Sequence, residues 1–264
     1  MAGKPIARAA PAGRSLESWL RFYRGTWKSS LISGFLSPLL YLGSLGFGLG
    51  SLIDSGGRGG LDGVPYAVFV APGVMAATAM QAAVGESTYP VMGAILWQRQ
   101  YHAMLATPLG VPDVVLGHLA FIALRLLIVS TVFAGIGAGL GAFRSAWLLA
   151  AVPICVLCGL AHAPVMMAFA ARQPDDSGFS LIFRFVLVPM FLFAGTFFPV
   201  DQLPAGLRPV AWLTPLWHAT ESIRGLLFGR AGVLSTAGHL AYLLLWVLAG
   251  YALALRSYRR RLVQ

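Results

Sequence analysis

Long apolar runs separated by short polar stretches dominate the pattern of this chain. Six of these runs are predicted as membrane spans, at residues 31–53, 66–92, 113–141, 147–171, 180–198 and 236–256. A helix that crosses a bilayer core of about 30 Å needs about 20 apolar residues, because each residue advances the helix by about 1.5 Å. The pattern therefore predicts an all-α integral membrane protein with six transmembrane helices in one domain, residues 1–264.

The segment before the first span follows a different pattern. Leu16, Trp19 and Tyr23 recur at helical spacing, whereas arginines occupy the opposite face. Aromatic residues on one face and arginines on the other are typical of a helix that lies in the membrane interface. The sequence therefore predicts an amphipathic interfacial helix at residues 15–28, preceded by a disordered cytoplasmic tail at residues 1–14.

Residues 199–235, between the fifth and sixth spans, are semi-polar and interrupted by proline. Four prolines prevent a single continuous helix in this segment: Pro199, Pro204, Pro209 and Pro215. We expect short re-entrant or surface helices that form an outer hairpin. A seventh span at 210–228 is the alternative, but it would place His218, Glu221 and Arg224 in the hydrocarbon.

Composition and charge agree with a membrane location. The chain is 58% hydrophobic and 11% charged, whereas soluble proteins have about 25% charged residues. The net charge of +10 would suggest nucleic acid in a soluble protein, but here the basic residues lie at the chain ends and in loops. Most of them fall in the N-terminal segment, after the second and fourth spans and at the C-terminal end, which predicts that both termini are cytoplasmic.

Motifs for independent catalysis are missing from the sequence. Nothing matches the phosphate-binding pattern GxxxxGK[ST], so we expect no ATP hydrolysis by this chain itself. Cys155, Cys158 and His162 share one helix face, but a structural zinc needs a fourth ligand that is not evident. Buried packing of these side chains is the favoured interpretation, and we expect no metal and no cofactor bound by this chain.

Glu86 and Arg125 are the ionisable residues that lie deepest in the predicted spans. An arginine at the bilayer centre costs at least about 2.5–3.5 kcal/mol on insertion scales, so Arg125 should face protein, water or an opposite charge. Glu86 is the first candidate partner. A structural ion pair and a direct contact with a transported substrate both remain open.

The second cytoplasmic segment, residues 93–112, is the most informative part of the sequence. It is expected to continue the second span as a helix and to stop at Thr107 and Pro108. Trp97, Tyr101 and Leu105 then share one face, which favours docking into a groove of another protein. An interfacial elbow without any partner is the alternative.

Three features resemble permease subunits of type-2 ABC exporters, and are closest to the nodulation lipo-oligosaccharide and daunorubicin-type drug exporters. The first is GESTYPVMGAILWQRQYHAMLATPLGVPDVVLG, at residues 85–117. The second is FLFAGTFFPVDQLPAGLRPVAWLTPLWHATESIRGLLFG, at residues 191–229, and the third is Arg125. His118 is a departure, because family members often carry an acidic residue at this position.

The resemblance implies one subunit of a larger exporter in the bacterial inner membrane. Two permease chains, identical or sister chains, would pair with two ATPase subunits that use ATP and magnesium. Together they would move an amphipathic lipid, lipo-oligosaccharide or drug outward. The ATPase-coupling residues would be Trp97, Arg99, Tyr101, Leu105, Thr107 and Pro108. The outer hairpin would include Phe197, Phe198, Pro199, Pro215, Glu221 and Arg224.

Two other classes of function are compatible with a polytopic chain. A secondary transporter that works alone would usually contain paired internal repeats, and we find none between residues 31–141 and 147–256. A membrane-embedded enzyme that modifies lipids would need a convergent set of catalytic side chains, which the sequence does not indicate.

Overall fold

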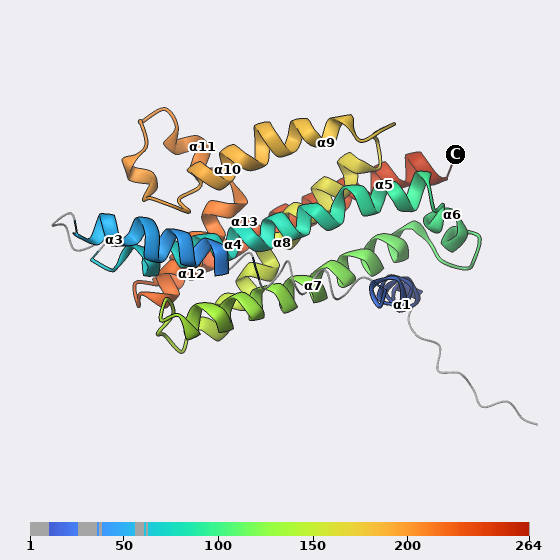
Figure 1. The fold of residues 1–264 in the computed structure, drawn as a ribbon. Coiled ribbons are helices and arrows are strands. Elements are labelled where there is room, and N and C mark those ends of the chain that lie inside the picture. Colours follow the sequence, from blue (N-terminus) through green and yellow to red (C-terminus); the bar gives the residue numbers. More distant parts are fainter. Residues whose placement is uncertain (1–10, 26–35, 37–38, 56–60, 62, 264) are drawn as a thin grey trace, which may run out of the picture.

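The computed structural model describes residues 11–25, 36, 39–55, 61 and 63–263. Within these residues the chain is helical, and the only β pairing among them is an isolated bridge between Leu61 and Val64. Figure 1 shows the long helices running side by side as an elongated bundle. The all-α fold predicted from the apolar runs is confirmed for this part of the chain.

Among the described residues, four helical segments are long and apolar enough to cross a membrane. They are α4–α5 (Tyr66–Ser87 and Tyr89–Leu96), α7 (Val111–Gly139), α8 (Leu148–Ala170) and α13 (Val233–Leu262). They correspond to the second, third, fourth and sixth predicted spans. The sixth is longer than predicted at both ends, because its polar C-terminal residues continue the helix without interruption.

Two further apolar helices coincide with the first and fifth predicted spans but are shorter. One covers Leu39–Ile53, with a π-helical part, η1 (Leu42–Leu49), followed by α3 (Gly50–Ile53). Residues 31–35, 37 and 38 of the first predicted span lie outside the described residues. The other covers Ser177–Phe193 and has three parts: α9 (Ser177–Ile182), the π-helical η3 (Phe183–Leu187) and α10 (Val188–Phe193).

The prediction that the fifth span ends at residue 198 is wrong. Phe197 and Phe198 were expected to end the helix, but α10 ends at Phe193. Gly195 has a φ of +79°, in the left-handed region that a continuing right-handed helix does not visit. The chain turns there, and Phe197 packs edge-on against Phe191 with ring centroids 4.9 Å apart.

Helix α4 lies at the centre of the bundle and α13 at its edge. Helices α7, α8 and α12 (Pro215–Leu227) all pack against α4. In the most apolar 18-residue stretch of Tyr66–Leu96, 72% of the residues are buried. Helix α13 packs mainly on α8, and only 17% of the residues in its most apolar 18-residue stretch are buried. Its exposed leucines, including Leu244, Leu245 and Leu248, suit contact with lipid or with another chain.

The proline-rich segment forms short helices, as predicted. They are the 3₁₀ turn η4 (Val200–Gln202), α11 (Arg208–Trp212) and α12. Thr214 caps α12 by accepting a hydrogen bond from the Trp217 backbone N–H at 3.3 Å. The alternative of a seventh span at 210–228 is wrong, because α12 has 13 residues, too few to cross the bilayer core.

Helix α1 (Pro11–Tyr23) begins four residues before the predicted interfacial helix, so residues 11–14 are not a disordered tail. Figure 1 shows α1 end-on while α7 runs across the view. The prediction that Trp19 rests on the membrane is wrong, because its side chain is 2% exposed and packs against α7. The periodicity identified the apolar face but not the neighbour that covers it.

The two ends of the bundle carry different elements. Helix α1, helix α6 (Gln100–Leu105) and the C-terminal end of α13 lie together at one end in Figure 1. Helices α3, α11 and α12 lie at the other. We call these the α6 end and the α12 end.

Candidate functional site at the α6 end

The segment between the second and third spans is broken into two helices. Helix α5 ends at Leu96, and Arg99 adopts a φ of +50° before α6 begins at Gln100. This left-handed residue rotates α6 relative to α5. The prediction that Trp97, Tyr101 and Leu105 share one face of a continuous helix is therefore wrong.

The predicted stop after this helix is confirmed. Helix α6 ends at Leu105, and the Thr107 hydroxyl donates a hydrogen bond to the Met104 carbonyl at 2.6 Å. Thr107 and Pro108 are both exposed in the turn that leads to α7. The Asp113 carboxylate accepts a hydrogen bond from the Gly110 backbone N–H at 2.9 Å and so caps the start of α7.

Tyr101 points into the protein and joins three helices. The Tyr258 hydroxyl of α13 donates to the Tyr101 hydroxyl at 3.5 Å, and the Tyr101 hydroxyl lies 2.7 Å from Nδ1 of His118 on α7. All three side chains are fully buried. Since the Tyr101 oxygen accepts from Tyr258, its own proton can be donated to Nδ1 of His118, and the neutral imidazole then carries its proton on Nε2.

Helix α1 completes this arrangement. The Trp19 indole stacks on the His118 ring with centroids 3.9 Å apart and planes 11° from parallel. The side-chain amide of Gln100 donates a hydrogen bond to the Ser18 hydroxyl at 3.0 Å, so α6 is bound to α1 directly. We call Trp19, Tyr101, His118 and Tyr258 the aromatic cluster.

Burial raises the pKa of Tyr101 well above its ordinary value, with smaller contributions from Tyr258. A phenolate would be costly in this apolar site, because the charged form loses its hydration. Tyr101 therefore stays protonated at physiological pH and can donate its hydrogen bond to His118.

A glycine permits the close contact between α1 and α7. A Cβ atom added to Gly117 would lie 2.3 Å from Cβ of Ser15 and 2.9 Å from the Ala12 carbonyl oxygen. Ser15 is itself fully buried, and its hydroxyl reaches the Val114 carbonyl at 3.4 Å. Helix α1 is therefore fitted to the N-terminal half of α7 at van der Waals distance.

The burial of Tyr101 changes the surface that this segment offers to a partner. Tyr101 was predicted to anchor in another protein, and that prediction is wrong because its side chain is 0% exposed. Leu105 is half-buried, whereas Trp97 is 66% exposed and Arg99 and His102 are also exposed. The free face of the segment is therefore formed around Trp97 and Arg99.

The two intramembrane charges meet, as the sequence suggested. Arg125 on α7 forms a salt bridge with Glu86 on α4, and both side chains are largely buried. The Arg125 guanidinium also lies over the Tyr23 ring of α1, 5.0 Å from its centroid. This pair therefore joins three helices and satisfies both charges within the chain.

At the α12 end, Arg224 occupies a buried position. It forms a salt bridge with Glu221 at 2.7 Å, donates to the Gly195 carbonyl at 2.8 Å and lies 4.0 Å from the centroid of the Phe69 ring. Its side chain is buried, with 6% of its surface exposed. It links α12 to α4 and to the turn after α10.

The same turn lies directly against α4. A Cβ atom added to Gly73 would lie 2.7 Å from Cα of Thr196. Of the other predicted hairpin residues, Phe198 packs beside a small cluster that includes Val200, and Pro215 is buried at the start of α12. Pro199 is partly buried where it precedes η4.

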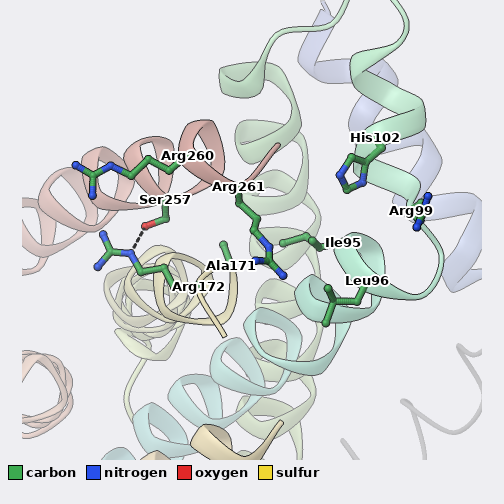
Figure 2. A pocket seen from close by; sticks show the side chains of 9 residues that line it. All are labelled: Ile95, Leu96, Arg99, His102, Ala171, Arg172, Ser257, Arg260 and Arg261. Atoms are coloured by element: carbon green, nitrogen blue, oxygen red, sulfur yellow. Dashed lines mark hydrogen bonds between the residues drawn. The ribbon is translucent and has the colours of Figure 1, made fainter. Parts of the chain in front are cut away.

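The ends of three spans line an open cavity of about 610 Å³ at the α6 end. We call it the arginine cavity, because it is lined by four arginines with His102, Ser257 and three apolar residues: Arg99, Arg172, Arg260, Arg261, Ile95, Leu96 and Ala171. Figure 2 shows Arg172 beside Ser257, with Arg261 lying near Ile95 and Ala171. The Arg172 Nε atom donates to the Ser257 hydroxyl at 2.9 Å.

The cysteines pack inside the bundle. Cys155 and Cys158 are free thiols and fully buried, and Nδ1 of His162 lies 2.8 Å from the Cys158 carbonyl oxygen. Within the described residues, no group of three or more His, Cys, Asp or Glu side chains could hold a metal ion.

Sequence reasoning missed most of the aromatic cluster and the whole arginine cavity. Tyr258 and Arg261 belong to one C-terminal basic stretch, and Arg172 lies in a distant loop, so their proximity depends on how α8 and α13 pack. His118 was noted only because related permeases often carry an acidic residue at its position. A histidine in an apolar run, one residue after Gly117, was the available signal for a buried polar contact.

Comparisons with known proteins agree with this architecture. Residues 16–228 match the family described as ABC-2 type transporter. Nodulation protein J of Rhizobium leguminosarum bv. trifolii is 34% identical over the full length of both chains. Its counterpart in R. leguminosarum bv. viciae is 33% identical over 96% of this chain and 98% of that protein.

A more distant relative is the inner membrane transport permease YadH of Escherichia coli K12, which is 25% identical over 90% of this chain and 93% of its own length. The family match covers the coupling segment, the Glu86–Arg125 pair and α12 together. This chain therefore belongs to the ABC-2 type transporter family, of which it is a membrane-spanning permease subunit.

Proposed function

We propose that this permease forms half of the membrane pathway of an ATP-driven exporter. Two permease chains, identical or sister chains, pair in the bacterial inner membrane. Two separate ATPase subunits bind ATP and magnesium, and the permease itself hydrolyses nothing. The observation that carries this proposal is the α6 end, where an exposed Trp97 lies four residues from the fully buried Tyr101.

That arrangement suits the transmission of movement. A partner that displaces Trp97 and Arg99 also displaces α6, because the two helices α5 and α6 are joined by only three residues. Tyr101 then transmits the displacement to His118 on α7 and Tyr258 on α13 through hydrogen bonds. The ATPase therefore contacts the exposed face of the segment around Trp97 and Arg99, while the aromatic cluster connects that face to the spans.

We further propose six spans with both termini cytoplasmic. Helices Leu39–Ile53 and Ser177–Phe193 complete the four longer spans. This topology puts the α6 end at the cytoplasmic surface. It makes α11 and α12 an outer hairpin, with α12 packed back against α4 and α8.

Cysteine labelling in intact cells tests this topology. Cys155 and Cys158 are first replaced by alanine, and then Ser177→Cys and Ser235→Cys are introduced separately, since both serines are exposed. An impermeant maleimide should label Ser235→Cys but not Ser177→Cys until the membrane is opened. Labelling of Ser177→Cys in intact cells contradicts the six-span arrangement.

The cargo is proposed as an amphipathic lipid, lipo-oligosaccharide or drug. Support comes from the two full-length relatives named nodulation protein J and from the exposed apolar faces of α9 and η3. Phe185 on η3 and Leu181 on α9 are both largely exposed, and an amphipathic molecule could pass along such a surface.

Substitution of Trp97 tests the coupling role. Truncation of a central aromatic anchor commonly weakens an interface by 2 kcal/mol or more, which is about thirtyfold. We expect Trp97→Ala to reduce co-purification of the ATPase by about that factor and to reduce transport in vesicles. Trp147→Ala is the matched control. Trp147 is 61% exposed, like Trp97, but it lies just before the start of α8, near Leu226 at the α12 end of the bundle. Equal effects of the two variants would refute docking at Trp97.

A further inference from the structure

The arginine cavity is a concentration of positive charge of which the proposed coupling mechanism uses only Arg99. It lies at the ends of α5, α8 and α13, which places it at the depth of lipid headgroups when these spans cross the bilayer. The last turns of the three helices line it from different sides in Figure 2. Its walls combine arginine side chains with Ile95, Leu96 and Ala171.

The helix ends alone do not neutralise this charge. Each helix C-terminus contributes about −0.5 elementary charge, so three such ends contribute about −1.5. Arg99, Arg172 and Arg261 alone therefore leave a surplus of about +1.5 around one cavity. If arginines only balanced the helix dipoles, fewer would be enough.

For Arg99, Arg172 and Arg261, no acidic side chain in the described part of the chain supplies the negative charge that would balance them. None of the three ion pairs found there involves Arg99, Arg172 or Arg261. Asp175 is the acidic residue closest in sequence to Arg172, and its carboxylate is bound instead to the hydroxyl and backbone N–H of Ser177, at 2.6 and 3.0 Å.

We propose that the arginine cavity binds the headgroup of an anionic glycerophospholipid. Its phosphate would lie between Arg172 and Arg261, and the upper part of its acyl chains would contact Ile95 and Leu96. A volume of about 610 Å³ is in the range of pockets that hold drug-sized ligands, which is enough for a headgroup. Basic pockets between spans on the cytoplasmic side are a known means of recognising such lipids.

The proposal rests on the topology given above, which puts the α6 end at the inner leaflet. Its test does not depend on transport, however, because lipid binding is measured on the purified permease without any ATPase. Loss of the lipid site would leave the export proposal intact. Failure of the Trp97 experiment would likewise leave lipid binding unchanged.

Native mass spectrometry provides the measurement. The permease is delipidated in detergent and titrated separately with dioctanoyl phosphatidylglycerol, dioctanoyl phosphatidylcholine and glycerol 1-phosphate. We expect phosphatidylglycerol to bind at least fivefold more tightly than either of the other two. Equal binding of the zwitterionic lipid overturns charge recognition, and equal binding of glycerol 1-phosphate shows a phosphate-ester site rather than a lipid site.

Substitutions then locate the binding. Arg261→Gln and Arg172→Gln should each weaken binding of phosphatidylglycerol about fivefold, and together about 25-fold, whereas Arg261→Lys should keep most of the affinity. Arg256→Gln with Arg259→Gln is the matched control, since these residues lie on the same helix and do not line the cavity. Equal losses in the control pair refute the site, because they reflect general charge attraction.

Thermal unfolding of each variant separates binding from folding. A variant that melts at the wild-type temperature and loses the lipid supports the proposal. If Arg261→Gln and Arg172→Gln both fail to fold, Arg261→Lys decides the outcome. Its failure to retain phosphatidylglycerol while folded would overturn the proposal.

Discussion

Removal of a single oxygen atom from Tyr101 is the most direct test of the aromatic cluster. In Tyr101→Phe the ring and its packing remain, while Nδ1 of His118 loses its partner at 2.7 Å and the Tyr258 hydroxyl loses its acceptor at 3.5 Å. Leaving a buried polar group without a hydrogen bond costs about 1–3 kcal/mol. Since all three side chains are fully buried, water cannot replace the lost partner without a rearrangement.

We therefore expect Tyr101→Phe to lower the free energy of unfolding by about 1–3 kcal/mol, and Tyr101→Ala by about 3–5 kcal/mol because a cavity is added. Unfolding is followed by circular dichroism as dodecyl sulfate is titrated into mixed micelles. Tyr89→Phe is the matched control. Its ring is 46% exposed, and its hydroxyl makes no hydrogen bond with any described residue, so the same deletion should be almost neutral.

A double-mutant cycle isolates the bond itself. Tyr101→Phe, His118→Ala and the double variant are compared, and residues in direct contact typically give an interaction energy of 0.5–3 kcal/mol. An interaction energy near zero, with single variants that are each destabilised, would refute the hydrogen bond as the link between α6 and α7. A loss in Tyr89→Phe as large as in Tyr101→Phe would refute the argument from burial.

Three further outcomes are expected. Arg125→Leu should lower the free energy of unfolding by about 1.5–3 kcal/mol, because Glu86 loses a charged hydrogen-bond partner, and Arg125→Lys should lower it less; equal stability of both variants to wild type contradicts the pair. Gly117→Ala should cost about 1–3 kcal/mol by overpacking and should speed maleimide labelling of Ser15→Cys, and unchanged labelling would contradict the close contact. Arg224→Gln should reduce protein level and export together, because the arginine is a buried link between helices; loss of export alone, at full protein level, would assign it a role in transport.

The sequence was sufficient for the features that depend on local pattern. The long spans follow from hydrophobic length, and the turn at Thr107 and Pro108 follows from the inability of proline to continue a helix. The Glu86–Arg125 pair could be predicted because charges in hydrocarbon have few acceptable neighbours.

Features that depend on which surfaces meet could not be predicted in the same way. The period of residues 15–28 shows that Trp19 and Leu16 share a face, but both lipid and α7 are acceptable neighbours for an indole. The inward direction of Tyr101 depends on the positive φ of Arg99, which is uncommon for any residue other than glycine. The arginine cavity requires the relative positions of three helix ends, which no periodicity contains.

Two consecutive residues near the C-terminus give helix α13 a geometric constraint. Ser257 receives a hydrogen bond from Arg172, and Tyr258 donates one to Tyr101. Neighbouring side chains on an α-helix project about 100° apart, so the two bonds restrain the same turn from two directions. A rotation of α13 about its axis cannot shift one of these contacts while the other stays fixed. We therefore expect the rotation of α13 about its axis to couple ligand binding in the arginine cavity to the position of α6.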